Sequence, residues 1–263
     1  MNIGLIIVGD EILSGKREDK HLPKVIELLA ARGLSLSWAR YVGDDRPRIT
    51  ADLQHALASG DLVFSCGGIG ATPDDHTRQC AAAAAGVDLV LHPQAAELIL
   101  ERMRDMAAEQ GVPFEPDRPD NVHRLNMGTF PAGARLIPNQ YNKIPGFSVA
   151  HVHFVPGFPV MAWPMIEWVL DQHYAHLHRS ERSKERSVIV FGAMEASLTP
   201  LMEDIERQFS DIKVFSLPSV DHPQWGRHIE LGVKGAGDGV TAFAALRQGL
   251  ERFGATLGPE LVR

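Results

Sequence analysis

Two kinds of apolar spacing alternate along the first part of the chain. Residues 2–8 (NIGLIIV) are a short and nearly continuous apolar run, which is typical of a strand buried on both faces. Residues 19–32 carry apolar side chains at helical spacing and stop at a glycine, which commonly ends a helix. Strands at 34–42 and 61–68, with a helix at 46–59 between them, continue the alternation. This order of elements predicts an open, mostly parallel sheet.

The alternation continues to about residue 174. The further elements that it predicts are helices at 73–85, 93–110 and 160–174, strands at 134–137 and 151–155, and a long loop with short structured pieces over 112–134. Together with the first elements they predict an α/β domain with a mostly parallel sheet over residues 1–173.

A second domain is expected after a polar stretch. Residues 174–186 are charged and unlike either flank, and we expect a linker there. The pattern then starts again and predicts a small α+β domain over 187–263. Its expected elements are strands at 187–192, 213–220 and 227–235 and helices at 196–209 and 238–252.

Composition narrows the class of protein. The 263 residues are 44% hydrophobic and 22% charged, with a net charge of −7 and no basic run, which argues against nucleic acid as the principal partner. The only cysteines, Cys66 and Cys80, have no metal-type spacing. The start lacks the features of a signal peptide, and no apolar run approaches the about 20 residues that span a bilayer. We therefore expect a cytoplasmic protein without a membrane anchor.

The stretch 64–77, FSCGGIGATPDDHT, combines a glycine-rich turn with two aspartates. Gly67, Gly68 and Gly70 lie where a predicted strand ends and a helix begins, which is where open α/β sheets bind ligands. Glycine lets the backbone approach a ligand closely, and the N–H groups at a helix start favour phosphate. The spacing fits neither the dinucleotide-binding glycine motif nor a Walker A loop.

The aspartates that follow allow two interpretations. Thr72 could be an N-cap with Asp75 as its capping-box partner, which would need no ligand. Alternatively, Asp74 and Asp75 beside a phosphate loop indicate a divalent cation between carboxylate and phosphate. We take the cation as the hypothesis, with Asp75 as metal ligand or base.

A second acidic loop, GDEILSGKREDK (9–20), follows the first strand. Asp10 and Glu11 come directly after the apolar run, and Ser14 and Gly15 offer further donors. Neighbouring parallel strands end at the same edge of a sheet, so we expect this loop to face the glycine-rich turn and Asp10 to join Asp74 and Asp75 at the metal. A polar loop that only caps the next helix is the alternative.

Two Pro-Gly turns also follow predicted strands. They are Pro145–Gly146 in NQYNKIPGF and Pro156–Gly157 in FVPGFPVMAWPM, and each is also common loop punctuation. Zinc-ligand spacing and a nucleophile elbow are absent from the sequence.

These motifs resemble a known family. GGIGATPDDHT resembles the G-G-T-G-x-T-x-x-D-x-T signature of the MoaB/Mog-type molybdopterin-binding domain, and GDEILSGKREDK resembles that family's first loop. The order of all four loops is most similar to the N-terminal region of the competence/damage-inducible CinA family, and the small second domain is similar to the KH-like domain that follows there. The sequence shows no counterpart of that family's C-terminal amidase domain, so we expect no nicotinamide-mononucleotide deamidation.

The resemblance carries expectations for fold and function. It implies that the first domain is a three-layer α/β/α domain with a mostly parallel sheet. It implies a phosphate held by Gly67, Gly68, Gly70 and Thr72, with Asp75 as the acidic residue of the signature. It also implies a homo-oligomer and either molybdopterin handling or hydrolysis of ADP-ribose with Mg²⁺, Mn²⁺ or Co²⁺. The chain departs from the family at His21, where an asparagine is usual, and in the 139–147 loop, which lacks the usual N-P-x-G start.

Three functions remain open from the sequence. The first is metal-dependent hydrolysis of a pyrophosphate such as ADP-ribose. The second is a non-catalytic module that binds a pterin or a nucleotide phosphate. The third, RNA binding by the second domain, is weaker because GAGDG (235–239) is a poor match to a G-x-x-G loop.

Overall fold

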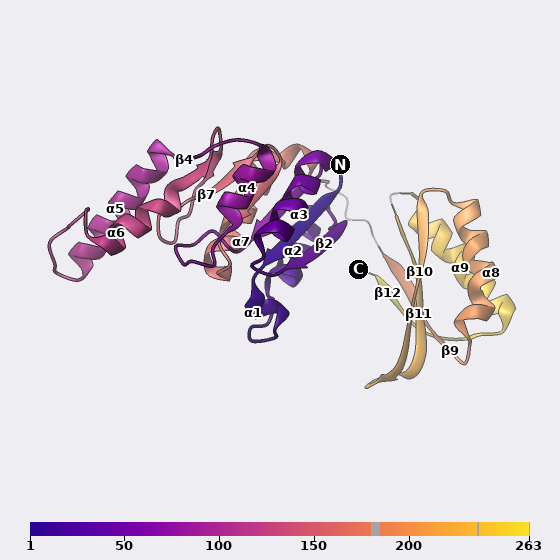
Figure 1. Cartoon of the computed structure of the whole chain (residues 1–263). Helices are drawn as coiled ribbons and strands as arrows, with labels where there is room; N and C mark the ends of the chain where they lie inside the picture. The colour runs from indigo at the N-terminus through magenta and orange to yellow at the C-terminus, as the bar shows by residue number, and fades with distance from the viewer. Residues whose placement is uncertain (180–184, 236, 263) are drawn as a thin grey trace. The chain divides into compact units, whose positions relative to one another are not determined.

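The chain divides into two compact units, Met1–Arg179 and Ser180–Arg263 (Figure 1). A computed structural model describes residues 1–179, 185–235 and 237–262. The expected linker, 174–186, includes residues 180–184, which lie outside the described residues. The expected boundaries, 1–173 and 187–263, therefore stay a prediction, and the two units are described separately below.

The first unit is built on a six-stranded sheet in the order β2-β1-β3-β8-β7-β6. The first four strands in this order are parallel, and β7 and β6 are antiparallel to their neighbours. The parallel strands are β1 (Ile3–Val8), β2 (Trp38–Val42), β3 (Leu62–Cys66) and β8 (Val152–Val155), and the antiparallel ones are β7 (Gly146–Val149) and β6 (Arg135–Ile137). Both β1 and β3 are buried along their whole length, as their apolar runs predict.

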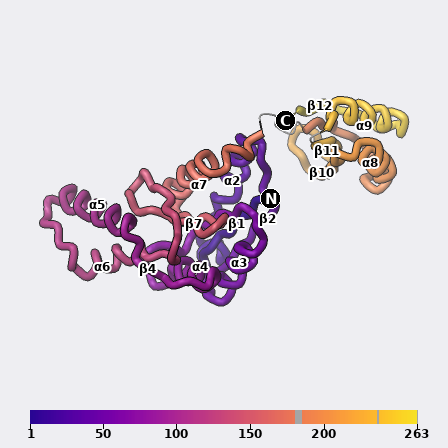
Figure 2. The backbone as a smooth tube through the Cα atoms, turned by 90° about the horizontal axis from the view of Figure 1, so that it is seen from above, coloured from indigo at the N-terminus to yellow at the C-terminus, as the bar shows by residue number. Residues whose placement is uncertain are grey.

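Helices cover both faces of this sheet, which gives the predicted three layers. Figure 2 shows α2 (His21–Ala30) and α7 (Pro159–His173) on one side and α3 (Arg46–Ser59) and α4 (Thr77–Ala85) on the other. Each side has its own apolar core, one around Phe64 and Met165 and one around Phe147 and Phe154. Residues in β1 contribute to both cores, so the strand joins the layers.

An arm extends from one end of this unit (Figure 1). It consists of α5 (Pro93–Glu109), α6 (Pro119–Leu125) and the 3₁₀ turn η1 (Asn126–Gly128). At its base, the strands before and after these elements, β4 (Leu89–Leu91) and β5 (Thr129–Pro131), pair as a short antiparallel ladder. The sequence predicts α5 and, over 112–134, a long loop with short structured pieces, and the structure has α6, η1 and β5 there.

The second unit is a four-stranded antiparallel sheet in the order β10-β11-β9-β12. Its elements are β9 (Arg186–Phe191), α8 (Glu195–Gln208), β10 (Ile212–His222), β11 (Gly226–Gly235), α9 (Gly239–Phe253) and β12 (Thr256–Val262). Apolar residues of the strands and of both helices form a core of their own. The predicted α/β domain followed by a small α+β domain is confirmed, except that β12 is absent from the prediction.

A buried polar network lies between the sheet and the end of α7. The ring of His153, which is inaccessible to solvent, lies 2.8 Å from Ser148 Oγ through Nδ1 and 2.9 Å from the Tyr174 hydroxyl through Nε2. Burial lowers the pKa of His153 to about 3, so the ring is neutral at ordinary pH.

None of the helices in the described part of the chain has the length and apolar character that a membrane span requires.

Candidate functional site

The loops that follow β1, β3 and β8 meet at one edge of the sheet, because the three strands are parallel neighbours. Gly157, after β8, lies against Gly67, after β3: a Cβ added to Gly157 would be 3.5 Å from the Cα of Gly67. The side chain of His21, after the first loop, reaches the Gly157 carbonyl at 3.0 Å through Nε2. These two contacts join the turn after β8 to the glycine-rich turn and to the start of α2.

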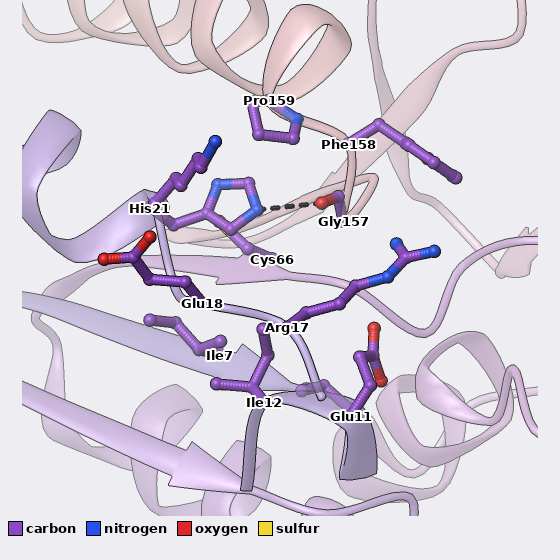
Figure 3. A pocket seen from close by; sticks show the side chains of 12 residues that line it. Ile7, Glu11, Ile12, Arg17, Glu18, His21, Cys66, Gly157, Phe158 and Pro159 are labelled. Carbon is purple, nitrogen blue, oxygen red and sulfur yellow. Dashed lines mark hydrogen bonds between the residues drawn. The ribbon is translucent and has the colours of Figure 1, made fainter. Parts of the chain in front are cut away.

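A cavity of about 400 Å³ lies where the first and third of these loops approach each other (Figure 3). Its apolar lining comes from the strand ends and the start of α7, with Ile7 and Ile12 on one side and Pro159 on the other. The complete lining is Ile7, Val8, Glu11, Ile12, Arg17, Glu18, Lys20, His21, Cys66, Gly157, Phe158 and Pro159. Of the residues that the sequence singles out for the site, only Glu11 and Gly157 line it.

Both signs of charge occur around the cavity. Arg17 and Lys20 are exposed cations, and Glu11 is a half-buried carboxylate. His21 is 5% exposed; its Nε2–H donates to the Gly157 carbonyl, which leaves Nδ1 as an acceptor without a partner among the described residues. Asp19 fixes this histidine at the start of α2 by accepting from its backbone N–H at 2.7 Å.

The glycine-rich turn is held tightly between β1 and α4. Gly67 and Gly68 have φ of 103° and 68°, in the left-handed region that favours glycine, and a Cβ on Gly67 would collide with the carbonyl of Val8. Thr77 ties the turn to the helix because its Oγ1 donates to the Gly67 carbonyl at 3.1 Å and its N–H to the Gly68 carbonyl at 2.9 Å. These glycines are needed for packing, whatever ligand the turn holds.

The helix after the turn begins later than the sequence predicts. It starts at Thr77 with His76 as N-cap, so the interpretation of Thr72 as an N-cap is wrong. Asp75 turns back instead: its Oδ2 accepts from the Thr72 N–H at 2.8 Å and from the Thr72 Oγ1 at 2.5 Å. The same carboxylate lies close to Gly70, where an added Cβ would be 2.6 Å from Oδ2. Asp74 is exposed.

The loops after β1 and β2 are joined through their aspartates. Asp10 donates its backbone N–H to Asp44 Oδ2 at 3.0 Å, and Asp44 returns its own N–H to Asp10 Oδ1 at 3.2 Å. Burial raises the pKa of the Asp44 carboxyl, and the negative charges of Asp10, Glu11 and Asp74 raise it further. Three carboxylates therefore act on the carboxyl of Asp44 at this edge.

The other predicted site residues have more local roles. Ser14 and Gly15 lie after α1 (Asp10–Leu13), and their N–H groups donate to carbonyls of the same turn. Pro145 and Gly146 are buried at the start of β7, where a Cβ on Gly146 would lie 2.7 Å from Met165 Cε. Pro156, between β8 and Gly157, is half-buried.

Sequence reasoning misses several residues at this edge. Asp44 follows a predicted parallel strand, so the argument that found Asp10 could have found it as well. The sequence carries no local pattern that indicates the cavity or its lining residues Arg17 and Phe158. The cavity forms only where loops that are distant in the sequence meet. The sequence carries no such pattern for Arg78, which is buried beneath the glycine-rich turn, since it stands alone at the start of an alanine-rich helix.

Comparisons with known proteins identify relatives of this chain. The chain is 33% identical over 213 residues to a CinA-like protein of Anaeromyxobacter dehalogenans, a match that covers 78% of this chain and 49% of the relative. A CinA-like protein of Syntrophotalea carbinolica is 30% identical over 225 residues, covering 80% and 51%. The chain thus spans about half the length of these curated relatives.

A solved structure and a family model complete the comparison. The crystal structure of the protein CinA from Thermoplasma acidophilum, described as of unknown function, superposes with a TM-score of 0.55 at 27% identity and covers 65% of this chain and 98% of that one. The family described as "Probable molybdopterin binding domain" matches residues 4–176, which contain every loop of the site. The chain belongs to this molybdopterin-binding-domain family, and its relatives within it are CinA-like proteins.

Proposed function

We propose that the chain binds a heterocycle joined to a phosphate or pyrophosphate at this edge of the sheet, and that it hydrolyses the pyrophosphate with a divalent cation. The observation that carries the proposal is the cavity between the first and third loops, with the glycine-rich turn and the carboxylates at the same edge of the sheet. The proposal includes a homo-oligomer, which rests on the family resemblance alone.

The cavity supports a planar heterocycle with polar edges as its occupant. Its volume of about 400 Å³ lies within the ordinary range of ligand pockets, and its walls combine aliphatic side chains with a few polar groups. Arg17 and Lys20 are cations that could meet the phosphate of such a ligand. A pterin and an adenine nucleotide both meet this description.

The carboxylates fit one kind of cation site and not another. Among the residues that the structure describes, no group of three or more His, Cys, Asp or Glu side chains could hold a metal by itself. Mg²⁺, however, is commonly held by one or two carboxylates together with substrate phosphates and water. Asp10 and Asp74, whose charges both act on Asp44, would supply the two carboxylates of such a shared site. A cation bound there would polarise the phosphoryl group and neutralise its charge.

The residues of the chain have distinct roles in this proposal. The turn at Gly67–Thr72 holds the phosphate, and Asp10 and Asp74 face the cation. Asp75 accepts a proton from the attacking water at Oδ1, because Oδ2 is already held by Thr72. Glu11 lies in the cavity wall and is the second candidate for this base.

A second function, binding without turnover, is favoured by the contact between Thr72 and Asp75. Two hydrogen bonds from Thr72 engage Asp75, and an aspartate that only fixes the turn would be held in this way. The chain would then bind a pterin or nucleotide phosphate and leave it unchanged.

The test is a hydrolysis assay on the purified chain. With Mg²⁺, Mn²⁺ or Co²⁺ we expect ADP-ribose and water to give AMP and ribose 5-phosphate, and Asp75→Asn to lower the rate about 100-fold or more. Asp117→Asn, which removes the same charge from an exposed loop of the arm, should keep the wild-type rate. Saturable binding of ADP-ribose or a pterin without turnover would establish the second function, and no binding of either would refute both.

A further inference from the structure

Arg78 is a buried cation directly beneath the glycine-rich turn. It is 5% exposed, and its two terminal nitrogens donate to backbone carbonyls: Nη2 to Gly70 at 2.7 Å and Nη1 to Asn126 at 2.6 Å. Its Nε has no hydrogen-bond partner, and no carboxylate of the described residues forms a salt bridge with it. The guanidinium therefore joins the turn to η1 without an ion-pair partner of its own.

A charge in this position calls for compensation. Burial lowers the pKa of Arg78, and the nearby charge of Asp75 opposes that shift only from a distance. Arginine stays protonated in proteins, so it cannot escape burial by losing its proton. A buried charge without a partner is strongly unfavourable, and an anion bound at the turn would provide the missing partner.

The bond to Gly70 also orients the turn. A trans peptide is planar, so its C=O and N–H point in opposite directions. Because the Gly70 carbonyl points inward to Arg78, the N–H of Ala71 in the same peptide points to the other side of the turn. Ala71 is exposed, and none of the described residues accepts from its N–H.

We propose that Arg78 is a positioning residue for a phosphate or pyrophosphate group: it turns the Gly70 peptide so that the Ala71 N–H donates to the anion, and it supplies the buried positive charge beneath it. This inference rests on the proposed function, since it assigns a residue to the phosphate seat of that site. The chemistry that it selects is a multiply charged oxyanion.

The experiment uses the full chain and inorganic pyrophosphate as the probe. In the ¹⁵N-labelled wild type we expect pyrophosphate to shift the Ala71 amide proton downfield. In calorimetry, Arg78→Gln should raise the Kd for pyrophosphate about 10- to 100-fold, as expected for the loss of a charged donor. Arg78→Lys, which keeps the charge but cannot hold both carbonyls, should fall between the two.

A matched control separates positioning from stability. Arg32 is a largely buried arginine that donates to Asp171 and to the Leu28 carbonyl at the far end of α2. Arg32→Gln should lower the melting temperature but leave pyrophosphate affinity within about twofold.

The outcomes distinguish the two proposals. If the wild type binds pyrophosphate while the Ala71 amide stays still, the Arg78 proposal fails alone. It also fails if Arg78→Gln binds as tightly as the wild type. If Arg78→Gln does not fold, the wild-type amide shift and Arg78→Lys still decide. A wild type that binds neither pyrophosphate nor ADP-ribose overturns the proposed function, and this inference with it.

Discussion

Burial shifts the pKa of individual side chains in this protein. His153 is the clearest case, because its ring is closed off between Phe64, Ser148 and Tyr174. Its two hydrogen bonds suit the neutral ring, and among the residues that the structure describes none of opposite charge is close enough to stabilise an imidazolium. Protonation therefore competes directly with folding.

We expect the free energy of unfolding to fall as the pH drops below about 6.5. The folded pKa of His153 is lowered to about 3, so between these values the unfolded chain binds the proton and the folded chain does not. The loss should be about 1 kcal/mol per pH unit. Urea unfolding between pH 7 and pH 5 measures it, with His153→Gln as comparison. Equal pH slopes for the two proteins would contradict the prediction.

Among the elements, the loops at the ends of neighbouring parallel strands form the candidate site. The loops after β1 and β2 bind each other through the backbone N–H groups of Asp10 and Asp44, and they do so with two like charges. Such an arrangement is tolerated because the hydrogen bonds offset part of the repulsion. A cation would offset the remainder.

Asp44→Asn should separate these two effects. The amide oxygen can still accept from the Asp10 N–H, while the repulsion among the carboxylates decreases. In EDTA we expect the free energy of unfolding to rise by about 0.5 kcal/mol. In Mn²⁺ we expect a smaller rise in melting temperature than the wild type shows. Equal stabilisation of both proteins by Mn²⁺ would place the cation elsewhere.

Much of this element plan was predictable from the sequence, and the exceptions have physical causes. The buried runs of β1 and β3 and the glycines after them are local signals, and they correctly brought Asp10 to the edge where the glycine-rich turn lies. The start of α4 was not predictable in the same way, because Asp75 folds back onto Thr72 and the helix begins only at Thr77. Contacts such as His21 with Gly157 join positions far apart in the chain, which no local pattern reveals.

The missed strand β12 illustrates a further limit. Gly258 and Pro259 interrupt its apolar pattern and argue against a strand. In the structure they fall where the ladder with β9 shifts register, and β12 is the last strand of its sheet. A bulged edge strand tolerates both residues, but only the finished sheet shows that the segment is at an edge.

At the scale of the whole molecule, the chain is two units with separate cores. We expect residues 1–179 to fold alone and to bind pyrophosphate with the affinity of the full chain, because every loop of the site lies within them. Calorimetric unfolding and pyrophosphate titration of this fragment test the expectation. A fragment that unfolds without a cooperative transition, or loses affinity more than about tenfold, would show that the second unit completes the first.

The contact between Gly67 and Gly157 has a consequence for how such a site changes during evolution. The two turns that it brings together lie far apart in the sequence. Each follows a strand, β3 or β8, whose residues are all buried. Insertions or exchanges in one turn leave the other turn and the sheet intact. Ligand selectivity can therefore change in one turn at a time among related proteins. A shared sheet is for this reason a poor guide to which ligand each of them binds.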